Sequence, residues 1–301
     1  MAATSIKIPA STANVGPGYD VLGIALSLYN TITIEESDTT EVIITGAKSD
    51  NSLPADKNNL VYQAIETFYN NLNRKCPDFK ITIDCQIPLA SGLGSSSTAI
   101  AGGLAIANKF ENEPFDTDTL LKLAWKLEGH PDNVAPAILG GFVISAITEE
   151  NDLVYKKLLW PEEWQIIICH PDFKLSTKEA RAILPAEIPL KDAIFNISCS
   201  SFLISAVCTK DEKALKLALK DKLHQPYRSK LVPGLTQIFE DLEKYNILGA
   251  VISGAGPSIC IINKNEDPSI ISNAVKTIWN RKNIDCEFFF PKVENNGIIY
   301  L

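Results

Sequence analysis

The feature that most constrains the fold of this chain is a glycine- and serine-rich segment that joins a strand pattern to a helix pattern. Apolar and polar residues alternate strictly over residues 79–88, which predicts a half-buried strand. The segment 88–98 contains Gly92 and Gly94 and runs into residues 99–110, where small apolar residues predict a helix. We therefore expect a tight glycine turn directly before the first turn of an apolar helix.

A turn of this kind is suited to binding an anion. Glycines adopt backbone conformations that other residues avoid, so several N–H groups point at one ligand, and the first-turn N–H groups of the helix add partial positive charge. Serine hydroxyls after the glycines bond phosphate oxygens or bind Mg²⁺, and Ser96 is the candidate on the metal side. The alternative interpretation is an ordinary strand-to-helix turn without a ligand.

Two familiar phosphate-binding motifs are excluded by their spacing. The Walker A motif requires Gly-Lys followed by Ser or Thr, whereas residues 46–49 read Gly-Ala-Lys-Ser. A dinucleotide fingerprint beginning at Gly16 would require a glycine at position 21, where the chain has Val21. Neither of the folds that carry these motifs is supported.

Composition narrows the class of protein further. The 301 residues include 28 Lys and Arg against 36 Asp and Glu, and the net charge of −8 argues against a nucleic-acid partner. Seven cysteines without a C-x-x-C pair, and an N-terminus without a charged-then-apolar leader, predict a reduced, cytoplasmic protein. The uncharged stretch 88–108 carries four Gly and four Ser, so we reject a transmembrane helix there.

Strand and helix patterns alternate along the rest of the chain. Strands are expected at 30–36 and 41–46, and helices at 60–72 and 120–127, the latter ending at Gly129. After Trp164 a strand at 165–169 precedes a helix opened by the capping box of Ser176 and Glu179. The remaining expected elements are helices near 192–208, 211–221, 234–246 and 267–281, and strands at 248–253, 258–262 and 284–290. A boundary near 159–163 divides the chain into domains 1–161 and 162–301.

Three separated segments together carry a family resemblance. They are residues 9–20 (Pro-Ala-Ser-Thr-Ala-Asn-Val-Gly-Pro-Gly-Tyr-Asp), the Gly92 loop, and residues 254–258 (Gly-Ala-Gly-Pro-Ser). In this order they resemble the GHMP small-molecule kinases. Within that superfamily the chain resembles the homoserine kinases through residues 14–23, 128–136, 176–185 and 225–228. The resemblance implies an α+β fold with two domains: an N-terminal mixed α/β domain that holds the nucleotide, and a C-terminal ferredoxin-like domain.

The resemblance implies that the Gly92 loop binds the phosphates of ATP. The implied nucleotide-binding residues of this loop are Pro88, Ser91, Gly92, Leu93, Gly94, Ser95, Ser96 and Ser97. Ser96 and Glu128 would bind Mg²⁺ and share a catalytic role with it. Asn59 is the implied adenine contact; Asn58 is a near-equal candidate, and a helix N-cap is the structural alternative.

The resemblance also implies how an amino-acid acceptor would be held. Asn14 and Asp20 would meet the amino and hydroxyl end of homoserine, and Arg181 and Arg228 its carboxylate, with His130 nearby. Charged hydrogen bonds of this kind contribute about 1.5–3 kcal/mol each, and an arginine fork also orients a carboxylate. Without the resemblance, a surface arginine and a turn aspartate are the more common interpretations of Arg181 and Asp20.

Asn133 stands where several sister kinases of the superfamily carry a catalytic aspartate. An amide does not usefully accept a proton near neutral pH, so we expect catalysis without a strong general base and treat Asp20 as a binding residue. Only four residues separate Glu128 from Asn133, fewer than in some relatives, which leaves the geometry of Glu128 open.

The resemblance therefore implies an ATP-dependent phosphorylation of L-homoserine to O-phospho-L-homoserine, a step of threonine biosynthesis, and it suggests that the protein forms a homodimer. Two alternatives remain open from sequence. One is a GHMP kinase for another small alcohol such as mevalonate or a sugar, since mevalonate also has a carboxylate; Asp20 discriminates better, because only the amino acid has an ammonium group. The other is a nucleotide-binding module without turnover, for which Ser96 and Glu128 would have no use.

Overall fold

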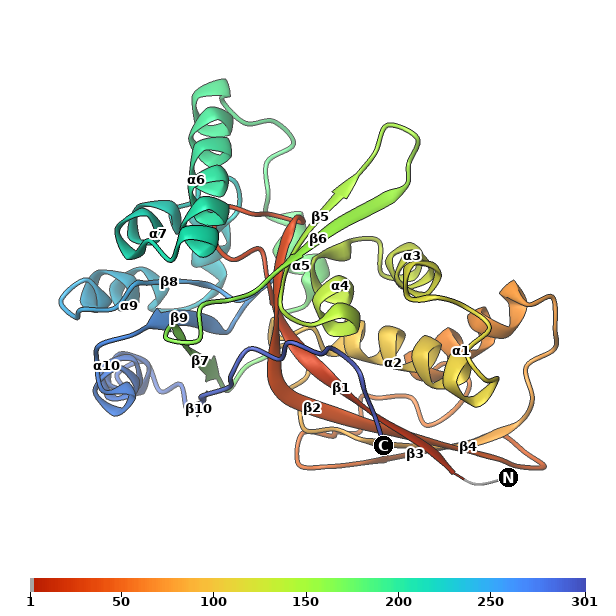
Figure 1. Cartoon of the computed structure of the whole chain (residues 1–301). Helices are drawn as coiled ribbons and strands as arrows, with labels where there is room; N and C mark the ends of the chain where they lie inside the picture. Colours follow the sequence, from red (N-terminus) through yellow and green to blue (C-terminus); the bar gives the residue numbers. More distant parts are fainter. Residues whose placement is uncertain (1–2) are drawn as a thin grey trace.

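The computed structural model describes residues 3–301 and contains two sheets that lie side by side, each with its own helices (Figure 1). The first sheet has seven strands, in which β11-β1-β2-β4-β3 form a continuous path and β5 and β6 extend from β2. Its strands are β1 (Thr4–Ala13), β2 (Leu22–Glu36), β3 (Glu41–Thr45), β4 (Phe79–Asp84), β5 (Phe142–Ile147), β6 (Leu153–Leu158) and β11 (Ile299–Tyr300).

One face of the first sheet is covered by four helices (Figure 1). They are α1 (Leu60–Asn71), α2 (Ser95–Phe110), α3 (Thr117–Glu128) and α4 (Pro131–Leu139). The strict alternation of β4 explains this arrangement, because Phe79, Ile81 and Ile83 are buried in the core under the helices while the residues between them are half-buried. Burial of these side chains holds the layers together.

The second sheet consists of four antiparallel strands in the order β10-β7-β9-β8. They are β7 (Gln165–Pro171), β8 (Gly249–Ile252), β9 (Ile259–Asn263) and β10 (Cys286–Phe289). In chain order the outer strands are the last and the second, which is the arrangement of a ferredoxin-like domain. The expected fold class is confirmed.

Helices cover both faces of the second sheet. The helices after β7 are α5 (Thr177–Ala182), α6 (Leu190–Thr209), α7 (Glu212–Ala218), α8 (Gln225–Arg228), a 3₁₀ turn (Ser229–Leu231) and α9 (Leu235–Leu242), and α10 (Pro268–Asn280) follows β9. Alternate residues of β7 separate two cores: Ile167 packs toward α9 and α10, whereas Ile166 and Ile168 pack toward α6, α7 and the buried end of β2. The core that contains Ile166 and Ile168 is shared between the two halves of the chain.

Local sequence signals place the ends of several elements as expected. Helix α3 ends at Gly129, which has a φ of +89°, and Ser176 and Glu179 form the expected capping box at α5.

The last residues return to the first sheet, where β11 pairs with β1 and Val293 bridges to Leu26. The division at residues 161 and 162 remains a prediction.

Candidate active site

The three segments that carry the family resemblance meet at one place between the two sheets. The Asn14 side chain donates to the carbonyl of Gly254 at 2.8 Å, and the N–H of Gly254 donates to Ala13 at 3.1 Å. Ser253 Oγ donates to the carbonyl of Gly92 at 2.8 Å. A Cβ on Gly92 would lie 2.2 Å from the Ser253 carbonyl oxygen, so only glycine permits this close contact between the loops.

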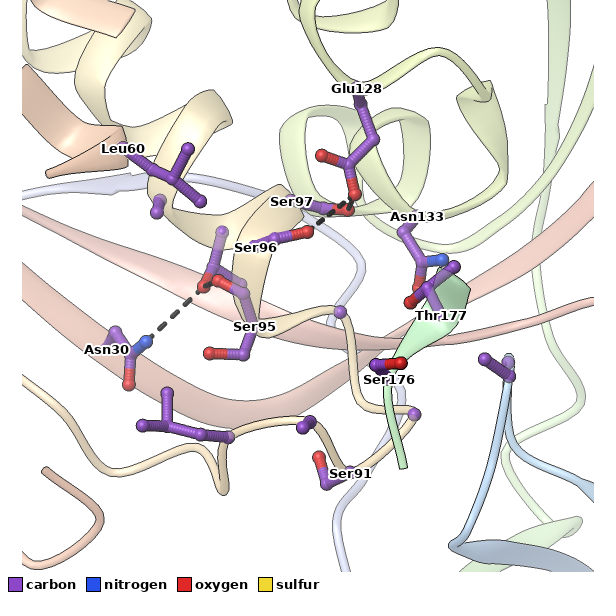
Figure 2. A pocket seen from close by; sticks show the side chains of 18 of the residues that line it. Asn30, Leu60, Ser91, Ser95, Ser96, Ser97, Glu128, Asn133, Ser176 and Thr177 are labelled. Atoms are coloured by element: carbon purple, nitrogen blue, oxygen red, sulfur yellow. Dashed lines mark hydrogen bonds between the residues drawn. The ribbon is translucent and has the colours of Figure 1, made fainter. Parts of the chain in front are cut away.

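A cavity of about 460 Å³ lies beside these loops and is lined from both halves of the chain (Figure 2). This volume is within the range of small-molecule sites. Figure 2 shows Ser95, Ser96, Glu128 and Asn133 on one side and Ser176 and Thr177 of the second domain facing them. The cavity lining also contains the predicted residues Asn14, Asp20, Asn58, Asn59, Ser91, Gly92, Gly94, Ser97, His130, Arg181 and Arg228.

The first turn of α2 opens into this cavity. Its N-cap is Gly94, which has a φ of +70° and provides no side-chain cap, so the first N–H groups of a 16-residue helix have no capping partner. Ser91 stabilises the preceding turn, since its hydroxyl donates to the Pro88 carbonyl at 2.7 Å and accepts from the N–H of Leu93 at 3.3 Å. The arrangement is that of a helix N-terminus open to an anion.

Two of the predicted loop residues do not line the cavity themselves. The side chain of Leu93 is fully buried in the shared core, and its carbonyl accepts from the N–H of Ser11 at 3.1 Å. Pro88 contributes the carbonyl that holds Ser91. Both residues shape the turn from behind.

Glu128 lies at the C-terminal end of α3 and reaches the first turn of α2. Its Oε1 accepts hydrogen bonds from the hydroxyls of Ser96 and Ser97, both at 2.7 Å (Figure 2). The short spacing between Glu128 and Asn133 therefore still brings this carboxylate to the serines. Among residues 3–301 no three His, Cys, Asp or Glu side chains gather as a metal cluster, and Glu128 with its two serines is a group of oxygen ligands at the turn.

Asn133 lies in the first half of α4 with its amide fixed in orientation. Its Oδ1 accepts a hydrogen bond from Ser11 Oγ at 2.8 Å, and among the described residues its Nδ2 has no partner. The amide therefore offers the cavity N–H donors, since its oxygen is occupied.

Asp20 and Arg181 form an ion pair across the cleft between the domains. The guanidinium of Arg181, in α5, donates to the two carboxylate oxygens of Asp20 at 2.7 and 3.0 Å and to Tyr19 Oη at 2.9 Å. Burial would lower the pKa of Arg181, but the hydrogen bond and charge of Asp20 outweigh it and raise the pKa. Asp20 itself is held by Asn14, whose Oδ1 accepts its N–H at 3.0 Å.

Arg228 is a buried cation without a carboxylate partner among the described residues. Its guanidinium donates to the carbonyls of Ala180 at 3.0 Å and Gly254 at 3.1 Å, and it lies over the ring of Tyr19 at 5.2 Å. His224 Nε2 donates to the carbonyl of Gly16 at 2.7 Å, so its Nδ1 accepts from Arg228 at 3.3 Å. Burial lowers the pKa of both Arg228 and His224, and His224 is neutral near pH 7.

His130 precedes α4 and is paired with a buried carboxylate. Its Nδ1 lies 2.8 Å from Oδ1 of Asp132. Burial would lower the pKa of His130, but the hydrogen bond and negative charge of Asp132 outweigh it, so the pKa is raised above 6.5. Burial in turn raises the pKa of Asp132. The pair places a polarised imidazole beside the Asp20–Arg181 pair.

The two asparagines before α1 have different environments. Asn59 is the buried N-cap of α1: its Oδ1 accepts from the N–H of Val61 at 2.9 Å and its Nδ2 donates to the Pro54 carbonyl at 2.8 Å. Asn58 is exposed and bonded to Asp56. Both border the cavity, so an adenine contact by either remains a prediction.

Sequence reasoning missed three residues that support the site. Asp132 orients His130, Tyr19 lies under both guanidinium groups, and His224 connects Arg228 to the Gly16 turn. Signals for them exist in the sequence. Asp132 and Tyr19 lie inside segments of the family resemblance, and His224 is one of only three histidines and directly precedes residues 225–228.

Comparisons with known proteins agree with this geometry. Family models match residues 59–141 (GHMP kinases N terminal domain) and 203–281 (GHMP kinases C terminal). A homoserine kinase from Carboxydothermus hydrogenoformans is 40% identical over 296 residues, which cover 98% of this chain and 96% of that protein. The chain belongs to the homoserine kinases of the GHMP superfamily. A homoserine kinase from Aquifex aeolicus is also 40% identical, covering 97% of this chain and 98% of its own.

Comparison with solved structures shows the same fold in related proteins. The crystal structure of homoserine kinase from Cytophaga hutchinsonii matches with a TM-score of 0.89 at 29% identity, covering 99% of this chain and 97% of that one. A mevalonate kinase structure matches with a TM-score of 0.70 at 20% identity, which indicates the shared fold alone. Membership of the homoserine kinase family thus extends over both domains described above.

Proposed function

We propose that this protein transfers the γ-phosphoryl group of ATP to the side-chain hydroxyl of L-homoserine and forms O-phospho-L-homoserine, a step of threonine biosynthesis. The observation that carries the proposal is a single cavity with two unlike sides. One side is an uncapped helix N-terminus beside Glu128, and the other has Asp20, Arg181 and Arg228. The first suits phosphates and the second suits a zwitterion.

The phosphate side binds mainly through the main chain. The N–H groups at the start of α2 and the hydroxyls of Ser95, Ser96 and Ser97 would bond the phosphate oxygens, and the glycines leave room for close approach. Asn59 and Asn58 border the far end of the cavity, where the adenine would lie. Ser91 holds the turn that presents these groups.

The residues present fit a magnesium ion. Mg²⁺ prefers hard oxygen ligands and is usually bound by one or two carboxylates together with substrate phosphates, which matches a single carboxylate beside serine hydroxyls. Glu128 and Ser96 would hold it. When bound, the ion supplies neutralisation of phosphate charge. In its absence Glu128 accepts the Ser96 and Ser97 hydroxyls, and it would exchange these hydrogen bonds for the metal.

The acceptor side is occupied by its own ion pair until a substrate arrives. The ammonium group of homoserine would take the place of Arg181 on Asp20, and the carboxylate would take the place of Asp20 on Arg181, with Arg228 as a second cation. Asn14 holds Asp20 in position, and His130 lies beside the pair. A ligand with only one of the two charges would leave either Asp20 or Arg181 without a partner.

Transfer needs alignment more than a base. Asn133 presents N–H donors because its oxygen is occupied by Ser11, and it would bond a phosphoryl oxygen rather than accept a proton. Asp20 is engaged in charge pairing. The homoserine hydroxyl would therefore attack the γ-phosphorus after alignment and lose its proton late, to the phosphate itself.

We further propose that the protein acts in the cytoplasm and as a homodimer. None of the seven cysteines forms a disulfide in the structure, and four of them lie on strands or the buried face of a helix, as expected of thiols kept reduced.

The test is a coupled assay of ADP release with homoserine, mevalonate and galactose as acceptors. We expect turnover with homoserine that requires Mg²⁺, and at least tenfold lower kcat/KM for the other two; preference for mevalonate or galactose would contradict the proposal. Glu128→Gln should weaken Mg²⁺-dependent binding of a nonhydrolysable ATP analogue, measured by calorimetry, by about tenfold or more. Glu113→Gln, a carboxylate paired with Lys109 on the surface, is the matched control.

A further inference from the structure

The segment between α7 and α8 contains a buried carboxylate, Asp221, that has no part in the steps described above. Its side chain is 0% exposed. Asp221 Oδ1 accepts hydrogen bonds from Asn196 Nδ2 at 2.9 Å and from the N–H of Leu223 at 3.0 Å. Asp221 Oδ2 accepts from the N–H of His224 at 2.9 Å and from the N–H of Gln225 at 2.6 Å. These four donors offset the cost of burying the charge.

Two of the residues bonded to this carboxylate also hold the turn that precedes Asp20. Asn196, on α6, donates from the same Nδ2 group to the Pro17 carbonyl at 3.0 Å. The ring of His224 donates from Nε2 to the Gly16 carbonyl at 2.7 Å. The carbonyls of Gly16 and Pro17 therefore have their hydrogen-bond partners in the second half of the chain, on residues that Asp221 itself holds.

The turn that precedes Asp20 has a backbone conformation that needs such support. Asn14 and Val15 have φ values of +67° and +45°. Asp20 has a φ of +58°. Residues with a Cβ avoid this region, and a β-branched residue such as Val15 does so most strongly. Because these conformations persist only where the surrounding structure holds them, the hydrogen bonds to the carbonyls of Gly16 and Pro17 help to fix the Asp20 carboxylate in place.

The same carboxylate also holds the helix that carries Arg228. Asp221 accepts the N–H groups of His224 and Gln225 at the start of α8, and Arg228 is the last residue of this four-residue helix. The guanidinium of Arg228 in turn donates to His224 Nδ1 at 3.3 Å. Arg228 and the turn that precedes Asp20 are therefore connected through one buried hydrogen-bond network.

We propose that Asp221 is a positioning residue for the acceptor, an inference that rests on the proposed function. It sets Arg228 and the turn that bears Asp20 at the spacing at which the carboxylate and the ammonium group of one homoserine molecule are both bound. Asp221 is not among the residues that line the cavity, so it acts through residues that are. Groups of this kind hold a binding site in its productive geometry without contacting the ligand.

The four donors require a carboxylate at this position. Each oxygen of Asp221 accepts two N–H groups, whereas an amide has one acceptor oxygen and one NH₂ group. Whichever way the amide of Asp221→Asn turns, its NH₂ group faces two donors, so either the start of α8 or the bond to Asn196 must move. Asp211, the N-cap of α7, is the matched control, because it accepts the N–H groups of Lys213 and Ala214 with a single oxygen. Asp211→Asn keeps both bonds.

Steady-state kinetics of the full chain with homoserine and ATP test the inference. Asp221→Asn should raise KM for homoserine at least about tenfold, with KM for ATP unchanged and kcat within about threefold of the wild type. Asp211→Asn should leave all three constants unchanged. A merely structural role of Asp221 would instead lower the fraction of folded enzyme, which changes kcat and leaves both KM values as they are.

A double-mutant cycle tests the route through Arg228. In an Arg228→Gln background, Asp221→Asn should raise KM for homoserine by no more than about threefold, because one of the groups that Asp221 positions is already absent. The same increase in KM in both backgrounds would overturn the inference, since it would show that Asp221 acts independently of Arg228.

Asn196→Ala is a second variant for the case that Asp221→Asn does not fold, which urea unfolding would show. It removes the donor to the Pro17 carbonyl, leaves the bonds at the start of α8 in place, and should raise KM for homoserine several-fold. Ser198→Ala, on the exposed face of α6, is its matched control. An unchanged KM for homoserine in the folded variants at positions 196 and 221 would overturn the inference alone. A wild type without homoserine turnover would overturn the proposed function, and the inference with it.

Discussion

In the proposed function the two sides of the cavity would recognise charge by different means. The phosphate side would use the main chain of a glycine turn, whereas the acceptor side would use charged side chains that are paired in the structure with one another or with carbonyls. Main-chain donors are fixed by the backbone, so substitution affects them mainly through glycine geometry. A single substitution can remove a charged side chain. We therefore expect single mutations to change specificity on the acceptor side rather than on the phosphate side.

The largest effect is expected from a substitution that breaks the phosphate side alone. A Cβ at Gly94 would lie 2.3 Å from Ser11 Oγ and 3.0 Å from Asn133 Oδ1. Gly94→Ala should therefore displace the first turn of α2 and lower kcat/KM for ATP at least 100-fold, while homoserine binding measured by calorimetry changes little.

Gly234→Ala provides the matched control for that substitution. Gly234 is also a helix N-cap with positive φ, at α9, and its added Cβ would meet mainly the flexible end of Lys282. This variant should lose about 1 kcal/mol of unfolding free energy and keep its kinetic constants. Equal kinetics for the two alanine variants would show that the helix start does not bind the phosphates.

A smaller effect is expected when the acceptor side alone is changed. Asp20→Asn removes one charged hydrogen bond to the substrate ammonium group, so KM for homoserine should rise about 10- to 100-fold with KM for ATP unchanged. Asp241→Asn, in an exposed pair with Lys244, should have no effect. If Asp20→Asn lowers kcat as much as it weakens homoserine binding, its role as a binding residue must be abandoned.

The next prediction concerns the buried pair beside the acceptor. Asp132→Asn removes the negative charge that keeps the pKa of His130 above its ordinary value, so burial should then lower that pKa below 6.5. A titration of the His130 ring by NMR measures the change, and kcat/KM for homoserine should fall several-fold at pH 7. An unchanged titration would mean that Asp132 does not set the charge of His130.

The smallest effect is a pH dependence of stability. Burial lowers the pKa of His224 below 6.5, so below that pH the unfolded chain binds a proton that the folded chain does not, and stability is lost as the pH falls. Urea unfolding at pH 7.5 and 5.5 should therefore show a loss that is about 1 kcal/mol smaller in His224→Gln than in the wild type. An equal loss in both proteins would contradict a neutral buried His224.

The sequence predicts elements well where the signal is local. The alternation of β4, the glycine stop of α3 and the capping box of α5 each depend on residues within one or two turns, and each is present. Strand β1 was not predicted, because all but one of its residues from Ile6 onward are buried and even Ser11 and Thr12 are inside, so no alternation marks it. Hairpin β5–β6 was also missed.

The candidate site, too, was predicted from the sequence only in part. Family resemblance identifies which residues gather, and nearly all of them border one cavity. It does not indicate that Asp20 and Arg181, 161 positions apart, pair with each other, or that His224 fixes Arg228. Such pairs depend on how two domains pack, which no window of neighbouring residues records.

The return of β11 to the first sheet affects how the protein is made. Residues 299–300 pair with Ile6 and Lys7. This edge of β1, the first strand to be synthesised, is therefore paired only after all the other described strands have been made. Until then the outer edge of β1 is open at these positions to solvent or to a chaperone. A chain that ends before residue 299 would therefore lack β11 and leave the edge of β1 unpaired at Ile6 and Lys7.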